Sequence, residues 1–391
     1  MSLLPRSLKP AFSRFLGARP GRLHAAAHSH HPWPDVSFDA QQQCWLDAAR
    51  LMDEKWTAIF AEQIPRAQGH LARLLQLPDP RSLVFAPNTH EFLLRLLSCL
   101  PPRPRILTTD SEFHSLSRQL RRLEEDGAVQ VARVAVEPFD TFPARWVAAI
   151  RQQPAELIWF SQCFFNSGYR LTDLQTPVAA VPDPQTLVVI DGYHGFMAMP
   201  TDLSALADRV FYLGGGYKYA MSGEGICFLH APPGQALRPV NTGWYAGFGQ
   251  LVEAQAGRVA YAEHGGRLWG ATFDPSGLYR FNAVMDWLLA EGLSPASIHA
   301  HVQQLQSELL ARLEPLWLKG AHSTWLSPAA GQPRGNFLSF RHPQALTLQQ
   351  RLSQLNVVSD VREDRLRIGL GLYHDLADID ELVGRLQAAR L

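Results

Sequence analysis

Lysine is scarce in this sequence of 391 residues. Lysine and arginine together number 36, but only Lys9, Lys55, Lys218 and Lys319 are lysines, so 32 basic residues are arginines. If a lysine amine takes part in chemistry, it is therefore one of four side chains. Lys9 lies in the N-terminal segment, Lys55 in a polar helical stretch and Lys319 in a linker, which makes Lys218 the strongest candidate.

Cysteine, excess charge and long apolar runs are lacking too. The four cysteines have no C-x-x-C or zinc-ligand spacing, which favours reduced core residues of a cytoplasmic protein. Basic and acidic residues both number 36, which argues against a nucleic-acid partner, and no apolar run suggests a membrane span. The first 34 residues lack Asp and Glu, as in an organelle transit peptide, but prolines interrupt any long amphipathic helix there.

Strands and helices alternate from about residue 40 to residue 235, which predicts α/β layering around a mostly parallel sheet. We expect a segment over residues 1–40 that contributes to the site, a large domain over 41–290 and a small α+β domain over 291–391. The seven strands expected in the large domain are Leu83–Ala86, Arg105–Thr108, Val129–Val136, Leu157–Ser161, Thr186–Ile190, Val210–Leu213 and Gly225–His230.

Chemically useful residues follow two of these strands, at the edge where open α/β sheets bind ligands. Asp191 comes directly after Leu187–Ile190, where a buried carboxylate needs a cationic partner such as a protonated pyridine nitrogen. Lys218 follows an apolar strand and three glycines, and a partly desolvated lysine is a competent nucleophile toward an aldehyde. Singly, Asp191 could be a turn residue and Lys218 a solvated loop residue, but the pair is more specific than either.

These two segments together resemble the core of a known family. Val188–His194, followed by Gly216-Tyr217-Lys218-Tyr219, is similar to the D-x-x-H/Q…K pattern of the aminotransferase class V superfamily, and looks most like kynureninase. The resemblance covers nearly the whole chain and implies the fold of the pyridoxal-phosphate-dependent transferases of fold type I. It also implies that Lys218 holds pyridoxal 5'-phosphate as a Schiff base and that Asp191 pairs with the pyridine nitrogen.

The resemblance implies four residues at the cofactor phosphate. Thr89 and His90 lie in a strand-to-helix turn that is similar to the family's phosphate-cradling turn. Tyr217 resembles the kynureninase tyrosine that reaches the phosphate, whereas the serine usual in this superfamily is replaced by glycine just before it. Thr272 resembles the element through which a neighbouring subunit contacts the phosphate, which implies a homodimer with shared active sites.

Three further residues are expected around the cofactor ring. Ser111–Ser115 is similar to the family's E-H-H-S segment, so that Phe113 would stack on the pyridine ring. Gln162 holds the place of a donor to the phenolic oxygen, and His194 would contact the same oxygen or the ring. Phe113 could also be an ordinary core residue, and His194 a structural one.

Substrate contacts are expected from both ends of the chain. Val358–Ile368, followed by Leu372-Tyr373, resembles the kynureninase pattern V-x-D-x-R…R…L-Y, in which Arg367 would grip the substrate α-carboxylate. Without that context, Arg367 could be a surface salt-bridge residue. Trp244 lies in a segment that resembles part of the kynureninase G-W-W-G-H element, and is expected to line the site.

The N-terminal residues His28, Ser29 and His30 stand where the family has a substrate-contacting element. A metal site is not expected here, because no carboxylate or distant histidine would complete the ligand set.

The expected activity is kynureninase-like hydrolysis of the Cβ–Cγ bond of an α-amino acid, or related lyase chemistry. Departures from the kynureninase pattern around Thr272–Pro275 leave the substrate open, and a class V aminotransferase is the alternative. A cofactor-free binding protein on the same fold is a third possibility. Cysteine desulfurase chemistry is not expected, since it needs a loop cysteine well after the lysine and no cysteine follows Cys227.

Overall fold

The computed structural model describes residues 3–247, 257–313 and 325–389. A seven-stranded sheet forms the centre of the large domain, and every neighbouring pair is parallel except those that β8 makes with β2 and β7. In spatial order the strands are β2 (Leu83–Ala86), β8 (Cys227–His230), β7 (Phe211–Gly215), β6 (Leu187–Asp191), β5 (Leu157–Ser161), β3 (Arg105–Thr109) and β4 (Gln130–Val134). The expected α/β class with a mostly parallel sheet is confirmed.

The inner strands are continuous apolar runs because both of their faces are covered. All residues of β5 and β7 are buried, and in β6 only the last residue, Asp191, is partly exposed. The predicted strand at Gly225–His230 begins two residues later, because Gly225 adopts a positive φ of 87° that belongs to a turn. The strand ends therefore carry the polar residues, as the sequence pattern indicates.

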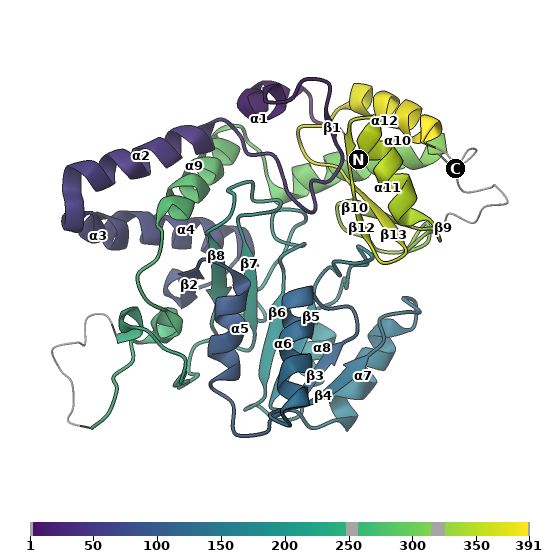
Figure 1. Ribbon diagram of the computed structural model, residues 1–391. Helices are drawn as coiled ribbons and strands as arrows, with labels where there is room; N and C mark the ends of the chain where they lie inside the picture. The colour runs from purple at the N-terminus through teal and green to yellow at the C-terminus, as the bar shows by residue number, and fades with distance from the viewer. Residues whose placement is uncertain (1–2, 248–256, 314–324, 390–391) are drawn as a thin grey trace.

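Helices surround this sheet, with α5 and α6 running in front of it in Figure 1. None of the described helices is long and apolar enough to cross a membrane. The helices of the first 290 residues are α1 (Ser13–Gly17), α2 (Val36–Leu51), α3 (Lys55–Ala58), α4 (Ile64–Leu75), α5 (Thr89–Leu97), α6 (His114–Glu125), α7 (Phe142–Gln152), α8 (Gln175–Ala179) and α9 (Ser276–Ala290).

The C-terminal part folds around a second antiparallel sheet, which Figure 1 shows beside the large domain. Its strands, in spatial order, are β12 (Asp360–Arg362), β13 (Arg365–Gly369), β10 (Phe337–Arg341) and β9 (Trp325–Leu326). Its helices are α10 (Pro295–Leu313), α11 (Ala345–Gln354) and α12 (Leu376–Ala388). Apolar residues of these elements form a core that is separate from the core of the large domain.

The N-terminal segment is attached to this C-terminal part. Strand β1 (Leu23–His24) pairs in parallel with β11 (Val357–Val358), and Ala26 forms a further bridge to Gly369. Leu23 also contributes to the C-terminal core. This pairing delivers the residues that follow β1 to the edge of the large sheet.

Candidate active site

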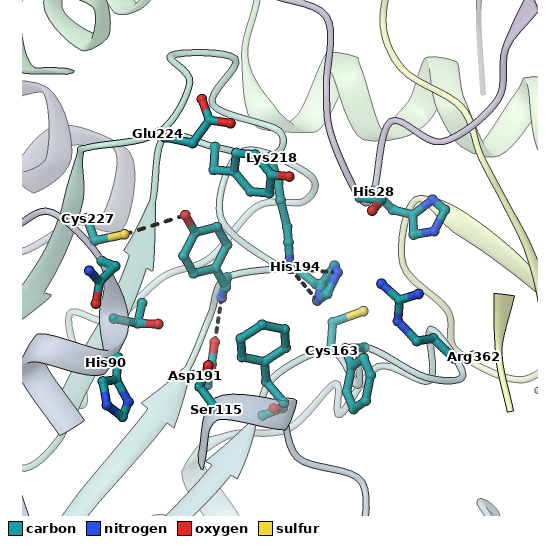
Figure 2. Close-up of a pocket in the computed structure, with 18 of the residues that line it drawn as sticks. His28, His90, Ser115, Cys163, Asp191, His194, Lys218, Glu224, Cys227 and Arg362 are labelled. Carbon is teal, nitrogen blue, oxygen red and sulfur yellow. Dashed lines mark hydrogen bonds between the residues drawn. The ribbon is translucent and has the colours of Figure 1, made fainter. Parts of the chain in front are cut away.

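A cavity of about 550 Å³ lies where the central strands of the large sheet end. Ser161 closes β5, Asp191 closes β6, and Lys218 follows β7 by three residues, and all three line the cavity. The N-terminal segment and the C-terminal sheet complete its wall with His28 and Arg367. Figure 2 shows Lys218 and Asp191 projecting into this space, Lys218 from the turn after β7 and Asp191 from the end of β6.

Lys218 is buried and lines the cavity. Its Nζ lies 2.9 Å from Nε2 of His194. Burial lowers the pKa of Lys218 to about 7; the carboxylate of Asp191 opposes this shift and the charge of Arg367 adds to it. A substantial fraction of the amine is therefore neutral near pH 7, which is the nucleophilic form.

His194 is the closest described partner of this amine. Burial, together with the positive charges of Lys218 and Arg367, lowers the pKa of His194 well below its usual range. The ring is consequently neutral and accepts a hydrogen bond from the lysine. Because its ring is neutral, His194 can lie next to the buried amine of Lys218 without electrostatic repulsion.

Asp191 supplies one of the two carboxyl groups that line the cavity, and Glu224 supplies the other. Oδ1 of Asp191 accepts a hydrogen bond of 2.9 Å from the backbone N–H of Tyr193, two residues further along the chain. Burial raises the pKa of Asp191, against the effects of that hydrogen bond and of the nearby charge of Lys218. A carboxylate in this environment is stabilised by a cation within the cavity.

The first turn of α5 forms one end of the cavity. Asn88 caps the helix by accepting a hydrogen bond from the N–H of Glu91 at 3.1 Å, and Thr89 and His90 begin the helix at the cavity wall. Free N–H groups and the helix dipole favour an anion at such a terminus. Thr89 and His90 thus lie at the helix terminus that faces the cavity, and their contact with a phosphate stays a prediction.

Aromatic side chains line another part of the cavity. The Lys218 Nζ lies 5.6 Å from the ring centre of Phe113, and that ring meets Phe165 edge-on at 5.9 Å. Tyr217 also lines the cavity, and its ring packs 5.2 Å from His30. Phe113 is 39% exposed, so that its face is available to a planar ligand rather than covered by the core.

The remaining wall is positively charged. Arg367 is buried on β13, donates from Nε to Oδ1 of Asp360 at 2.7 Å, and donates through its two terminal nitrogens to Asp360 and to the backbone carbonyl of Phe165. Arg362 lines the same wall, with Nη2 3.4 Å from Asp360. Two guanidinium groups against one carboxylate leave a net positive charge, which suits an anionic substrate group.

The N-terminal segment contributes His28 to this wall. His28 stacks on Phe337 at 4.6 Å, and its Nε2 lies 3.0 Å from Oδ1 of Asp360. Burial alone would raise the pKa of Asp360, but His28 and Arg367 outweigh it and hold this pKa well below its usual range. Asp360 therefore stays ionised and fixes the cationic Arg367 in place, together with His28, whose pKa burial lowers to about 4 so that its ring is neutral near pH 7. Ser29 lines the cavity beside His28.

Four of the predicted site residues lie elsewhere. Gln162 donates to Thr201 and accepts from Tyr212, both at 2.9 Å, because successive residues after a strand point to opposite sides and Ser161 takes the cavity side. His30 lies just behind the wall, stacked on Trp33.

The other two are Trp244 and Thr272, which do not line this cavity. Nε1 of Trp244 donates a hydrogen bond of 3.3 Å to Oγ1 of Thr272. They belong to segments that lie outside the cavity wall, and Trp244 is 46% exposed. The role of Thr272 at the cofactor phosphate of a neighbouring subunit stays a prediction. Lys319 lies outside the described residues.

A buried acid, which the sequence pattern did not predict as a site residue, lies behind the cavity. Glu112 accepts hydrogen bonds from the Oγ atoms of Ser161 at 2.6 Å and Thr109 at 2.7 Å. Burial raises the pKa of Glu112 to about 8, so its carboxyl group is mostly protonated at pH 7. Its place beside Phe113 in the E-F-H-S segment was the available signal. The cavity residues without a predicted role include Asn88, Ser161, Cys163, Phe165, Tyr193, Cys227 and Arg362.

Comparison with known proteins extends these observations. Residues 47–351 match the family described as aminotransferase class-V. A probable cysteine desulfurase of Vibrio cholerae serotype O1 is 23% identical over 261 residues, which span 64% of this chain and only 62% of that protein. Isopenicillin N epimerase of Streptomyces clavuligerus is 24% identical over 353 residues, 83% of each chain.

A solved structure resembles the whole molecule. It is a C-DES variant with glycine covalently linked to its pyridoxal-phosphate cofactor, and it matches with a TM-score of 0.79 at 17% identity, covering 96% of this chain and 98% of its own. This match shows that the chain has the fold of these cofactor-dependent proteins.

Proposed function

The chain belongs to the aminotransferase class V family, and we propose that it uses pyridoxal 5'-phosphate to hydrolyse the Cβ–Cγ bond of an aromatic α-amino acid, as kynureninase does. The observation that carries this proposal is the buried amine of Lys218, with a pKa of about 7, in one cavity with the carboxylate of Asp191. When bound, the cofactor supplies an electron sink for a carbanion at the substrate Cα.

The residues present fit this cofactor. The cavity has room for a pyridine ring and an amino acid, and it offers one nucleophilic amine, the half-buried carboxylate of Asp191 for the ring nitrogen and a helix N-terminus for the phosphate. Phe113 presents its face beside the amine and would lie against the ring. His194, 2.9 Å from the amine, would lie beside the phenolic oxygen.

Lys218 has two roles in this proposal. Its neutral amine would hold the cofactor through the aldehyde group, and the same amine would accept and return a proton at the substrate Cα. A pKa near 7 suits both roles, since the amine can accept and release a proton at neutral pH. Neutral His194 holds the amine at this position through their hydrogen bond.

The charged wall selects the substrate class. Arg367 and Arg362 together exceed the charge of Asp360 by one, and the wall faces the cavity that contains Lys218. An α-carboxylate at this wall would orient the bonds at Cα relative to the amine. Phe165, which meets the Phe113 ring edge-on, provides an apolar surface for an aromatic side chain, which favours an amino acid of the kynurenine type.

The relatives named above are a probable cysteine desulfurase and an epimerase, so the proposal of kynureninase-like chemistry is supported by residues of this chain and not by those relatives. A persulfide-forming desulfurase requires a reactive thiolate. Cys163 and Cys227 line the cavity, but burial raises the pKa of both thiols to about 12, so they remain protonated at neutral pH. Transamination, which needs proton transfer at Cα and a second substrate, is the remaining alternative.

Cofactor binding is tested on the purified protein. It should absorb in the visible range, and borohydride should fix the cofactor to Lys218, as located by peptide mass spectrometry. Lys218→Ala should lose the label, whereas Lys55→Ala serves as a matched control that keeps it. A colourless protein that added pyridoxal 5'-phosphate does not change would favour a cofactor-free binding protein and refute the proposal.

The reaction is tested with three substrates. Kynurenine should release anthranilate and alanine. Sulfide release from cysteine, or amino transfer from kynurenine to a keto acid without anthranilate, would assign the protein to another reaction of the family.

We also propose a homodimer, because the exposed Trp244 and its partner Thr272 lie outside the cavity of their own chain. Sedimentation analysis should give twice the mass of one chain, and Thr272→Ala should then weaken cofactor retention in the dimer. A monomer that retains the cofactor would exclude this arrangement.

A further inference from the structure

Tyr193 occupies the phosphate end of the cavity, although the proposed function gives it no role. Its ring centre lies 4.8 Å from the Lys218 Nζ, and its hydroxyl lies 3.4 Å from Sγ of Cys227. Figure 2 marks this hydrogen bond by the dashed line at Cys227. Cys227 pairs with Ala86, the last residue of β2, and α5 begins three residues after Ala86 at Thr89. The hydroxyl is therefore close to the helix terminus where the phosphate is expected.

Gly215 is the residue that makes this position possible. A Cβ built on Gly215 would lie 2.6 Å from the Tyr193 hydroxyl oxygen and 2.6 Å from Sγ of Cys227. Contacts that short force one of the groups to move. The absence of a side chain at Gly215, near the end of β7, and the presence of a phenol at Tyr193 are thus two parts of one arrangement.

The phenol is suited to bind an anion. Burial, with the neighbouring Cys227, raises the pKa of Tyr193 well above its ordinary value, so the hydroxyl remains a proton donor. Its described partner is a thiol, which is a weak hydrogen-bond acceptor. A phosphate oxygen is a much stronger acceptor and would be placed between the hydroxyl and the N–H groups of α5.

We propose that the Tyr193 hydroxyl, in the space that Gly215 leaves open, donates a hydrogen bond to the phosphate of the bound cofactor. This inference rests on the proposed use of pyridoxal 5'-phosphate. It assigns Tyr193 as a cofactor-binding residue that discriminates the phosphorylated vitamer from pyridoxal, and it gives Gly215 a steric role in the same contact.

Tyr193→Phe tests the hydroxyl. The apoprotein, prepared from the holoenzyme with hydroxylamine, is titrated with pyridoxal 5'-phosphate and with pyridoxal. Loss of a hydrogen bond to a charged group should weaken binding of the phosphorylated form by about ten- to a hundredfold and leave pyridoxal binding unchanged. Tyr279→Phe is the matched control, because it removes a hydroxyl bond to Asp47 on α2, outside the cavity, and should alter neither affinity.

Competition with inorganic phosphate tests whether the Tyr193 hydroxyl contributes to an anion site that the cofactor phosphate occupies. Phosphate should compete with pyridoxal 5'-phosphate in the wild type, and it should compete less strongly in Tyr193→Phe. Equal losses for both vitamers, or no loss for either, would overturn the assignment of the hydroxyl.

Gly215→Ser tests the steric part. The serine should displace the Tyr193 ring and weaken binding of pyridoxal 5'-phosphate, whereas Gly215→Ser combined with Tyr193→Ala should bind more tightly than Gly215→Ser alone. Purely additive losses would overturn the reciprocal arrangement. Borohydride labelling of wild-type Lys218 distinguishes a failure of this inference from a failure of the proposed function. If Lys218 is labelled but the Tyr193 and Gly215 variants bind the cofactor like the wild type, only the inference is refuted. If Lys218 is not labelled, the proposed function itself is refuted.

Discussion

Replacing Lys218 by methionine should make the cofactor-free protein more stable, because the cavity holds an amine in an environment that disfavours its charge. Burial lowers the pKa of Lys218 from 10.5 to about 7. At about 1.4 kcal/mol for each pH unit, this difference corresponds to about 5 kcal/mol of lost stability at and below pH 7. Methionine has a similar length and no charge, so the variant should recover much of that free energy, less what Asp191 loses with its cation.

The pH dependence of this effect has a definite sign. The pKa of Lys218 is lower in the folded state, so the unfolded chain binds more protons than the folded one between about pH 7 and pH 10.5. Wild-type stability therefore gains from this group as the pH rises through that window, by up to about 1.4 kcal/mol per pH unit. The variant lacks this contribution, so the two proteins should converge in stability at high pH.

Urea unfolding of the apoproteins at pH 7, 8 and 9 measures both effects. Lys55→Met is the control, because Lys55 lies on the short helix α3 outside the cavity, and its difference from wild type should not change with pH. If Lys218→Met is no more stable than wild type at pH 7, or if its advantage stays constant up to pH 9, the buried amine does not have the depressed pKa on which the proposed chemistry depends.

Two further predictions concern the walls of the cavity. Arg367→Lys retains a positive charge but loses the paired contact with Asp360. Steady-state kinetics should therefore show a KM for the amino acid that is about ten- to a hundredfold higher. An unchanged KM would exclude a contact between Arg367 and the substrate carboxylate. Glu112→Gln should change the unfolding free energy by less than about 1 kcal/mol at pH 7, since the acid is mostly protonated, whereas Glu112→Ala should lose about 2–4 kcal/mol by leaving the Ser161 and Thr109 hydroxyls unpaired. Equal losses for the two Glu112 variants, measured by urea unfolding, would contradict this account.

Much of the large domain could be predicted because its strands are buried on both sides and read as apolar runs. Parallel strands end at one edge, so Asp191 and Lys218 could be expected in one cavity before any contact was known. Gln162 shows where this reasoning stops, since the direction of a side chain just beyond a strand depends on which neighbour takes the cavity side. The rule that ligands bind where parallel strands end therefore cannot predict whether Gln162 or Ser161 faces the cavity.

Other features depend on contacts between residues far apart in the chain. Glu112 becomes a neutral buried acid only because Ser161 and Thr109 enclose it. Tyr193 fits only because Gly215 has no side chain, and neither residue reveals this in its own segment. His28 reaches the cavity through the pairing of β1 with β11, which local periodicity cannot predict.

The same pairing has a mechanical consequence for the site. Strand β1 and Ala26 are joined to β11 and Gly369, so His28 is tied to the sheet that holds Arg367 and Asp360. Lys218 and Asp191 belong instead to the large sheet, whose core is separate. Any displacement between the two cores would therefore move the carboxylate-binding wall as a unit relative to the amine, and binding of an α-carboxylate would favour the arrangement in which the substrate Cα meets Lys218.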